Sequence, residues 1–445
     1  MPRGPKNLKI SFTGKNLTHF GGVYLISLFL RWLHLKSILS KSLPLIQRNN
    51  HYSITESILA LMYPSMLGIG RIETTHLLKH NGVFHYLVGI PAYPNPTTLR
   101  RFLQRISQEE LTKLRSVQSQ LLKFMLAKPR PAKKIIFDMD STVLVLYGKQ
   151  ELATVGYNPI KRGRPSYHPL LCFDGITKDC ITAELRSGNT YTSTGTIALL
   201  EASFTKIPPT IKRVYIRADK GFFDHEIIEK IEEKPSRQFA IAAKLTSPIK
   251  RKLSSLRYQS PTHGIEAAEF FYQPVRWKKK SRFIVIRRPI PEDPTEQLSL
   301  FSLGKYSYQV IVTNMELKPI NIWRFYNGRA GVELIIKELK NDYPLAKIPT
   351  KHFAANESYF HILLFSYNLV NWFKRLCLPQ EFQTMTLSSL RARLLLIPGE
   401  LIHSGNRPIL KLPTHFRDKD AVEFALKKIS KLKFLHFSRR FQVKL

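Results

Sequence analysis

The stretch KKIIFDMDSTVLVLYG, residues 133–148, decides how the rest of the chain is interpreted. Its apolar residues predict a buried strand, and that strand carries two carboxylates, Asp138 and Asp140. Residues two apart on a strand point to the same face, so both acids lie on one side of the predicted sheet. A carboxylate at the end of a buried strand is unfavourable without a compensating cation. The stretch therefore predicts a catalytic or cation-binding site.

The composition predicts a folded protein with a polyanionic partner. The 445 residues are 43% hydrophobic, and 69 Lys and Arg stand against 32 Asp and Glu, which gives a formal net charge of +37. Basic side chains that neutralise phosphates release counterions, so this surplus favours nucleic acid as the partner. The longest apolar runs, 23–30 and 57–67, are too short to span a bilayer, and we expect no membrane partner. Three cysteines without CxxC or zinc spacing fit a cytoplasmic protein.

The periodicity of apolar residues changes along the chain. Residues 20–125 are mostly helical in pattern, and the Pro- and Lys-rich segment 127–134 marks a boundary. Beyond it, three adjacent strands precede alternating helices and strands, which is the element order of an α/β fold of the RNase H-like type. The predicted strands are 134–147, 167–175, 179–188, 213–219 and 238–245, and the predicted helices among them are 193–204 and 222–233.

Residues 246–315 interrupt this alternation, because their period-2 apolar spacing and Pro, Gly and Ser turns predict a β-rich insertion. Helical patterns return at 321–340, 354–377 and 418–432. The predicted domain organisation is an α-helical region (1–130), the first part of an RNase H-like core (131–245), the insertion (246–315), the second part of the core (316–378) and a basic C-terminal tail (379–445).

A second group of polar residues lies in FYNGRAGVELIIKELK, residues 325–340. Its tyrosine, arginine, glutamate and lysine follow one another at spacings of three, four and seven residues, which places them on one face of a single helix. Such a face suits a metal-binding carboxylate flanked by phosphate contacts, although an amphipathic helix with solvated charges has the same spacing. The four residues are Tyr326, Arg329, Glu333 and Lys340.

Two kinds of enzyme fit the aspartates by themselves. In a haloacid-dehalogenase-type phosphatase, Asp138 is the nucleophile, Asp140 the acid or base, and Mg²⁺ lies between them. In a two-metal phosphodiester enzyme, carboxylates from separate elements converge on the ions, and Asp140, Asp219 and Glu333 would supply them. The phosphatase interpretation is the weaker of the two. It assigns no role to residues 326–340, and it explains neither the late insertion nor the charge of the chain.

The motifs together resemble the DDE transposases of bacterial insertion sequences, in the branch with a Tyr-Arg-Glu-Lys signature and a β-insertion before the glutamate. The likeness covers roughly residues 15–410 and is strongest at 135–225 and 320–375. The resemblance implies that Asp140, Asp219 and Glu333 bind Mg²⁺, for which Mn²⁺ can substitute. It also implies that Tyr326, Arg329 and Lys340 contact transposon-end DNA. Asp138 is then a supporting group beside the ligand Asp140.

The resemblance also implies an activity and its partners. The enzyme would cut transposon ends and join them to target DNA, and a hairpin intermediate is compatible with the signature. The N-terminal region would bind the terminal inverted repeats, and two ends cut in one synaptic complex imply a homodimer or a higher assembly. A bacterial, nucleoid-associated cytoplasmic location follows. A domesticated, catalytically inactive DNA-binding protein is the alternative from another class.

Three further features lie outside these motifs. The basic loop residues Lys161, Arg162 and Arg164 include an Arg-Gly-Arg-Pro sequence like an AT-hook core, or they form a solvated loop; we expect contact with the DNA backbone. Trp277 is flanked by basic residues and suits either base stacking or, as we favour, the core. Asp224 is expected to be a structural residue at a helix N-terminus, near the site.

Overall fold

The structure is a computed structural model that describes residues 10–43, 52–128, 133–158, 161–290, 301–303 and 305–432. The chain forms two compact units. The first comprises Met1–Arg105, Asp342–Pro344 and Leu369–Leu445, and the second comprises Ile106–Asn341 and Leu345–Asn368. The predicted linker lies in part outside the described residues, at 129–132. The division falls before it, because α6 (Gln108–Leu126) packs within the second unit, where Gln118 donates a hydrogen bond to the carbonyl of His361 at 3.1 Å.

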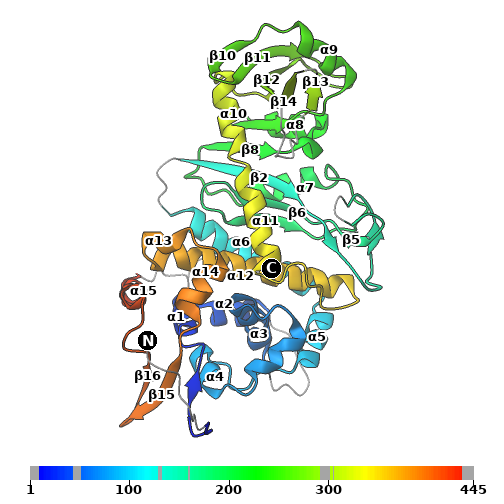
Figure 1. Ribbon diagram of the computed structural model, residues 1–445. Coiled ribbons are helices and arrows are strands. Elements are labelled where there is room, and N and C mark those ends of the chain that lie inside the picture. The colour runs from blue at the N-terminus through cyan, green and yellow to red at the C-terminus, as the bar shows by residue number, and fades with distance from the viewer. Residues whose placement is uncertain are drawn as a thin grey trace. The chain divides into compact units, whose positions relative to one another are not determined.

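The first unit is mainly helical (Figure 1). Its helix α3 is buried along its whole length except at Glu56, and a capping box of Ser53 and Glu56 begins it. Its N-terminal helices are α1 (Val23–Trp32), α2 (Leu35–Ser42), α3 (Ile54–Leu67), the 3₁₀ helix η1 (Ile72–Leu78), α4 (Gly82–Val88) and α5 (Pro96–Arg105). In the described ranges no single helix is long and apolar enough to cross a membrane; the bent pair α1 and α2 passes that test only together.

Much of the segment predicted as a basic tail is folded into the first unit. The strands β15 (Gly399–Ser404) and β16 (Arg407–Lys411) form a hairpin, and β15 also pairs with β1 (Leu17–Thr18). An ion pair between Arg393 and Asp418 joins two parts of this region. Its helical elements are α13 (Gln380–Gln383), α14 (Leu387–Leu390), the π-helical η3 (Arg391–Leu395) and α15 (Lys419–Lys431), and the last of these confirms the helix predicted at 418–432.

The second unit contains one large mixed sheet, in the order β10-β11-β12-β14-β9-β8-β2-β6-β7, with β13 also beside β14 (Figure 1). The predicted meander is confirmed: β2 (Lys134–Ser141), β6 (Leu170–Asp174) and β7 (Cys180–Glu184) are antiparallel neighbours. On the other side of β2, β8 (Arg213–Ala218) and β9 (Arg237–Ala242) run parallel to it. The chain thus has a mixed α/β fold in which β2 lies centrally between antiparallel and parallel neighbours.

The predicted insertion is β-rich, but its strands continue the same sheet. Residues 311–313 of β14 pair with residues 240–242 of β9, so the sheet has no break where the insertion begins. Both faces of β12 carry buried side chains, which explains its continuous apolar sequence FIVI. The elements are α9 (Ser247–Ser255), β10 (Gln259–Thr262), β11 (Ile265–Tyr272), β12 (Ser281–Pro289), β13 (Phe301–Leu303) and β14 (Tyr306–Thr313).

Helices and a small second sheet surround this sheet. The helix predicted at 321–340 is two helices, α10 (Pro319–Asn327) and α11 (Ala330–Asn341), separated at Gly328. Helix α10 packs on β9, β11 and β12, and α11 packs on β2, on one face of the sheet (Figure 1). The other elements of this unit are α7 (Thr196–Phe204), the 3₁₀ helix η2 (Lys220–Phe222), α8 (His225–Glu232), and a sheet of β3 (Leu144–Val145), β5 (Pro165–Tyr167) and β4 (Thr154–Val155). Helix α12 (Phe353–Cys377) belongs to this unit up to Asn368.

Candidate active site

Two of the predicted carboxylates lie side by side at the ends of neighbouring strands. Asp140 is the last but one residue of β2, and Asp219 directly follows β8. The two strands are parallel, with Met139 opposite Ala218, so the next residue of each strand is an acid. Asp140 Oδ1 accepts a hydrogen bond from the Ser141 N–H, and Asp219 Oδ1 accepts one from the Gly221 N–H, each at 2.8 Å. The fold therefore places two oriented carboxylates at one edge of the sheet.

The third carboxylate, that of Glu333, is linked to Asp140 by an arginine, Arg329. Glu333 lies in the first turn of α11. Arg329, just before that helix, donates from Nη2 to Glu333 Oε1 at 2.8 Å and from Nη1 to Asp140 Oδ2 at 3.3 Å. Only 14% of the Arg329 side chain is exposed, while 61% of Glu333 is. One guanidinium thus holds the carboxylates of β2 and α11 together.

The electrostatics of the cluster disfavour its negative charge. Burial raises the pKa of Asp140 from 3.8 to about 6, with Asp219 and Glu333 adding to the increase and Arg329 opposing it. Burial lowers the pKa of Arg329, but Asp140, Tyr326 and Glu333 raise it more, so Arg329 stays charged. Three carboxylates lie here with one cation, Arg329, among them. A further positive charge would therefore stabilise the ionised carboxylates.

The donor chemistry of this cluster fits a hard divalent cation, since carboxylate oxygens are the ligands that Mg²⁺ and Mn²⁺ prefer. In the ranges that the structure describes, no group of three or more His, Cys, Asp or Glu side chains is close enough to hold a metal ion. The observed arrangement has Arg329 between Asp140 and Glu333 instead. The residue types therefore fit the ion, and the present arrangement supplies the compensating charge from a side chain.

Asp138 is not available for chemistry. It is 1% exposed, and Arg217 donates to both of its oxygens, from Nε to Oδ1 at 2.6 Å and from Nη2 to Oδ2 at 2.7 Å. A carboxylate that is buried and bonded at both oxygens cannot attack a substrate as a nucleophile. This arrangement removes the main support for the phosphatase interpretation, and it distinguishes Asp138 from the partly exposed Asp140.

The expected stripe of four residues on one helix is wrong in its geometry. Tyr326 is the last residue but one of α10, Arg329 lies in the break, and only Glu333 and Lys340 lie on α11. The reason is the tight turn at Gly328, where the Arg329 N–H donates to the Tyr326 carbonyl at 2.9 Å in place of a regular α-helical bond. Tyr326 is 7% exposed in an apolar cluster, and burial raises its pKa. Lys340 is half-buried and donates to the Val143 carbonyl at 3.1 Å.

The three basic loop residues are all exposed. Lys161 donates to the hydroxyl of Tyr147, and its ammonium and the Arg164 guanidinium lie 4.9 and 5.9 Å from the Tyr147 ring centre. Gly163 between the arginines has a φ of 73°, which a side chain would strain. Lys161 and Arg164 therefore lie against the ring of Tyr147, which is 70% exposed, and Arg162 is exposed between them in the chain.

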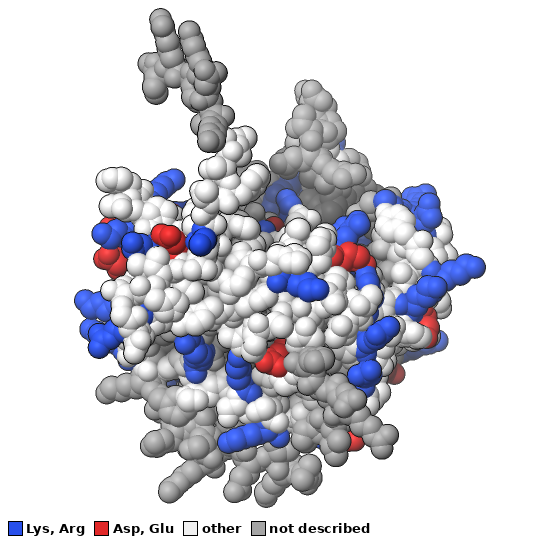
Figure 2. Space-filling model, turned by 90° about the horizontal axis from the view of Figure 1, so that it is seen from below, with Lys and Arg blue, Asp and Glu red and all other residues white. Residues whose placement is uncertain are grey.

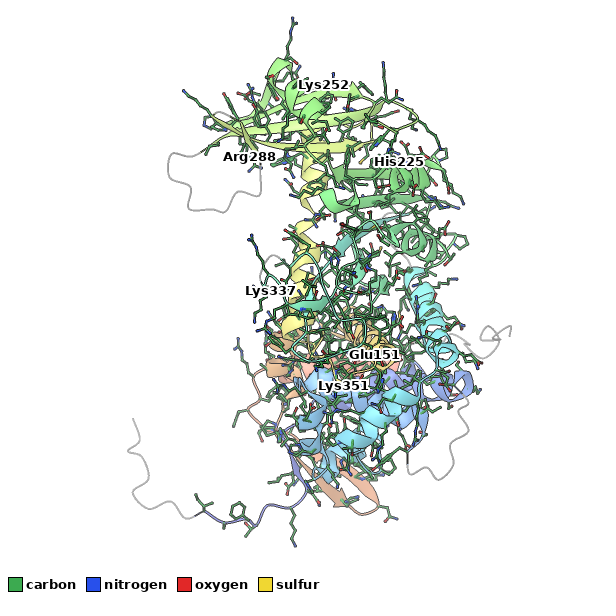
Figure 3. All side chains as sticks on the ribbon, turned by 90° about the vertical axis from the view of Figure 1, so that its right-hand side faces the viewer. Glu151, His225, Lys252, Arg288, Lys337 and Lys351 are labelled. Atoms are coloured by element: carbon green, nitrogen blue, oxygen red, sulfur yellow. The ribbon has the colours of Figure 1, made fainter. Side chains whose placement is uncertain are left out.

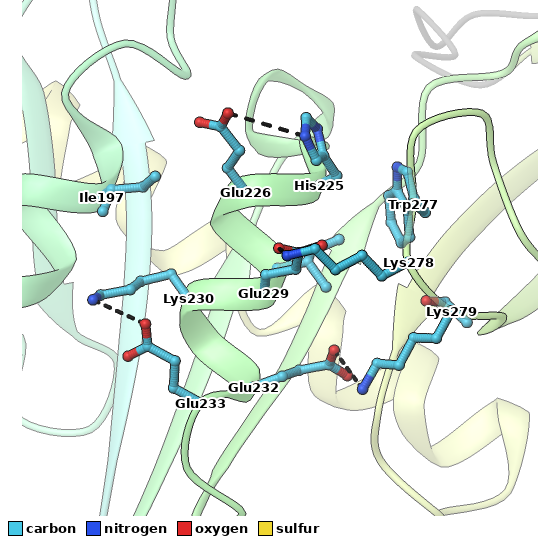
Figure 4. A pocket seen from close by; sticks show the side chains of 12 residues that line it. Ile197, His225, Glu226, Glu229, Lys230, Glu232, Glu233, Trp277, Lys278 and Lys279 are labelled. Atoms are coloured by element: carbon cyan, nitrogen blue, oxygen red, sulfur yellow. Dashed lines mark hydrogen bonds and ion pairs between the residues drawn. The ribbon is translucent and has the colours of Figure 1, made fainter.

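Trp277 is half-buried, so our expectation that it belongs to the core is wrong. Its ring lies 5.3 Å from that of Phe223 and 6.3 Å from that of Phe283, and it lines an open pocket of about 580 Å³ (Figure 4). Across the pocket, Lys278 pairs with Glu229 at 2.6 Å and Lys279 with Glu232 at 2.8 Å, both on α8. The loop that carries Trp277 is thus tied to α8 by its charges.

Asp224 has the structural role that we expected, because its Oδ1 accepts from the Glu226 N–H at 3.0 Å and begins α8. Two residues with a candidate functional role, Lys337 and Arg217, were not predicted from the sequence. Lys337 projects from the exposed side of α11, one turn after Glu333 (Figure 3). Lys337 lies four residues after Glu333, and this spacing predicts that the two side chains are neighbours on a helix. Arg217, two residues before Asp219, could have been found because it repeats the spacing of Asp138 and Asp140.

A histidine also lies beside the acids. His168 Nδ1 is 2.7 Å from the Thr190 carbonyl, which can only accept, so Nδ1 carries the proton. Its Nε2 then accepts from the Ser141 hydroxyl at 3.0 Å, and burial lowers the pKa of the ring. Ser141, whose N–H binds Asp140, is therefore fixed from two sides.

Comparison with known proteins defines the class. The family model described as "Transposase DDE domain group 1" matches residues 2–434. The chain belongs to this transposase family. No curated protein matches the sequence. Among solved structures, it is similar to the piggyBac transposase in a cryo-EM synaptic complex with hairpin DNA, with a TM-score of 0.41 and 12% identity, over 84% of this chain and 81% of that one.

Proposed function

We propose that this protein is the DNA transposase of a bacterial insertion sequence, which cleaves the element's ends and joins them to target DNA. The catalytic core is of the RNase H-like type, and Asp140, Asp219 and Glu333 are its catalytic carboxylates. The observation that carries the proposal is the arrangement of these three acids: Asp140 and Asp219 lie at the ends of adjacent parallel strands, and Glu333 is linked to Asp140 through Arg329. Membership of the transposase family supports the same activity.

The three carboxylates would hold Mg²⁺, or Mn²⁺ in its place. When bound, the ions activate the attacking oxygen and stabilise the leaving oxygen of the phosphodiester. The protein contributes orientation: Ser141 fixes Asp140, Gly221 fixes Asp219, and the start of α11 carries Glu333. The raised pKa of Asp140 fits a carboxylate whose negative charge is compensated by a bound cation. No covalent enzyme intermediate is needed.

DNA would be held by the basic surface. Lys161, Arg162 and Arg164 are exposed, and Lys and Arg side chains predominate over Asp and Glu on the face in Figure 2. Arg329, Lys340 and the exposed Lys337 flank Glu333 and suit phosphates of the transposon end. Tyr326 contributes through its contact with Arg329 rather than from the surface. The helical region 1–130 is proposed to bind the terminal inverted repeats, and synapsis of two ends calls for a dimer or larger assembly.

A cleavage assay tests the proposal. The purified protein is incubated with labelled DNA that brackets its gene, with Mg²⁺, with Mn²⁺ and with EDTA. We expect strand cleavage at the element's ends only with a divalent ion, and strand transfer when target DNA is added. Asp140→Ala, Asp219→Ala and Glu333→Ala should each lower the cleavage rate about a hundredfold or more while end binding stays within about twofold.

Glu226→Ala serves as the matched control, because it removes an exposed carboxylate of the same unit outside the cluster. Its cleavage rate should equal that of the wild type. Retained nicking in one of the three Ala variants would remove that residue from the ligand set. Binding of end DNA without cleavage by the wild type in any divalent ion would favour a catalytically inactive DNA-binding protein.

A further inference from the structure

Arg217 is a buried arginine whose three bonding nitrogens all have partners. It is 5% exposed on β8. Nε and Nη2 donate to the two oxygens of Asp138, and Nη1 donates to the carbonyl of Phe325 at 2.8 Å. The guanidinium also lies 5.1 Å from the Phe325 ring centre. One side chain therefore links β8 to β2 and to the last turn of α10.

The three linked positions each precede one of the proposed catalytic acids along the chain. Arg217 precedes Asp219 by two residues, and its partner Asp138 precedes Asp140 by two residues on the paired strand. The third contact, at Phe325, lies directly before the break from which Arg329 and Glu333 follow. None of the three contacts of Arg217 involves a proposed metal ligand. Its contacts instead fix the backbone two residues before each aspartate and eight residues before Glu333, at the end of α10.

We infer that Arg217, with Asp138, is the positioning residue of the active site, and that it fixes the α10–α11 junction so that Glu333 meets the two strand-end aspartates. The inference rests on the proposed function for its catalytic consequence. The geometric part, that Arg217 holds the junction, stands by itself and can be measured without DNA or metal.

Two glycines show how closely the pair is packed. A Cβ at Gly328 would lie 2.2 Å from Arg217 Nη1, and a Cβ at Gly175 would lie 2.6 Å from Nη2 and 2.7 Å from Asp138 Oδ2. Gly328 has ordinary helical dihedral angles, with φ of −59°, so its backbone does not require glycine. The guanidinium is what excludes a side chain there. The break in the helix is therefore shaped around Arg217.

A general stabilising role does not explain this arrangement. A buried ion pair is often no more stabilising than a well-packed apolar pair, because both charges lose their hydration. The arginine fork is specific in another respect: it bonds a carboxylate at two points and has a further donor for a third group. A lysine keeps the charge but lacks this geometry. Arg217→Lys therefore separates positioning from charge.

The experiment compares two variants with two matched controls. Arg217→Lys removes the fork, and Gly328→Ala pushes the guanidinium away. Arg282→Lys is the control for the first: Arg282 also bonds a carboxylate, Glu269, and a carbonyl, that of Met315, but on β12. Gly331→Ala is the control for the second, because its Cβ would meet only the flexible end of Lys178, at 3.0 Å, in the same segment.

Three measurements are made on the full chain: hydrogen–deuterium exchange without metal, Mn²⁺ binding by EPR titration, and end cleavage across Mg²⁺ concentrations. In Arg217→Lys and Gly328→Ala we expect faster exchange in residues 325–333. We also expect the half-saturating Mn²⁺ and Mg²⁺ concentrations to rise about tenfold or more, as for other residues that orient metal ligands. Excess Mg²⁺ should restore part of the cleavage. The controls should match the wild type in all three.

Unchanged exchange at 325–333 in both folded variants would overturn the inference, as would unchanged Mn²⁺ affinity beside a wild type that binds the ion. If Arg282→Lys weakens Mn²⁺ binding and speeds exchange as much as Arg217→Lys does, the effect is one of general stability, and the inference is overturned as well. If the wild type neither binds Mn²⁺ nor cuts DNA, the proposed function fails, and the exchange data still decide whether Arg217 holds the junction. Gly328→Ala decides the question if Arg217→Lys does not fold.

Discussion

Arg329 donates a hydrogen bond to Asp140 at 3.3 Å from one nitrogen while its other nitrogen bonds Glu333 at 2.8 Å. The positive charge of the cluster thus comes from a side chain that follows a helix break, not from the surface. An arginine in this place stabilises the acids when no ion is bound, because it compensates their repulsion in a partly buried site. It also means that added cations and Arg329 act on the same charges.

The first prediction concerns Arg329→Gln. Removing the guanidinium leaves Asp140 and Glu333 without their shared cation, and we expect the metal-free protein to lose about 1–3 kcal/mol of stability. Added Mn²⁺ should then raise the melting temperature of the variant more than that of the wild type. Thermal unfolding in EDTA and in Mn²⁺ measures both effects. Arg324→Gln, which removes an exposed arginine of α10, is the control. Equal Mn²⁺ shifts in variant and wild type would contradict the prediction.

The second prediction concerns the pH dependence of stability through Asp140. Its pKa is about 6 in the folded protein against an ordinary 3.8, so the folded state binds the proton more tightly than the unfolded state. This contribution is fully present below about pH 4 and is lost as pH rises through about 6. We expect Asp140→Asn, which never ionises, to be more stable than the wild type by about 1–3 kcal/mol at pH 7.5 in EDTA.

Denaturant unfolding from pH 3.5 to 8 tests this. The stability difference between Asp140→Asn and the wild type should disappear near pH 4, and saturating Mg²⁺ should reduce it at pH 7.5. Asp140→Asn should also lose cleavage, so the change that stabilises the fold removes the activity. Glu226→Gln, with an exposed carboxylate, should show no such pH-dependent difference. A difference that is constant with pH would show that Asp140 is not the group responsible.

Part of the site could be predicted from residues 133–148 and from the sequence around Asp219, because the apolar pattern and the end of a strand are local properties of the sequence. Asp140, Asp219 and the central meander could be predicted from apolar runs that end in an acid. The break at Gly328 was missed, although the Asn-Gly pair at 327–328 is a turn signal. The contact of this break with Arg217, more than a hundred residues earlier, could not be predicted from the sequence. The bond between Arg217 and Asp138 was equally hidden, because strand pairing decides which residues face each other.

The burial of two aromatic residues also differed from the prediction: Tyr326 is more buried than expected, and Trp277 is less buried. Tyr326 was expected at the surface because helical spacing aligned it with charged residues, but α10 packs it against the strands of the insertion. Trp277 was expected in the core because large aromatic residues usually lie there, but its loop is held at the pocket rim by Lys278 and Lys279. Both outcomes depend on how the insertion joins the sheet, which periodicity does not reveal.

The last prediction concerns DNA binding by the basic loop. Lys161, Arg162 and Arg164 are exposed, and two of them lie against Tyr147 in a shape that suits a phosphate backbone. Each phosphate contact contributes about −0.9 to the slope of log K against log salt concentration. Replacing all three with Ala should therefore weaken end binding at low salt and make the slope shallower by roughly 2–3. Binding titrations at several salt concentrations measure this directly.

The control for the basic loop is Lys278→Ala combined with Lys279→Ala. These lysines are as cationic as the loop residues, but each already pairs with a carboxylate of α8, so they release few counterions from DNA. We expect their slope to stay close to that of the wild type. An equal change in both sets would mean that only net charge matters. A loop variant with the wild-type slope would place the phosphate contacts elsewhere on the basic surface, and would leave the Arg-Gly-Arg sequence as a solvated turn.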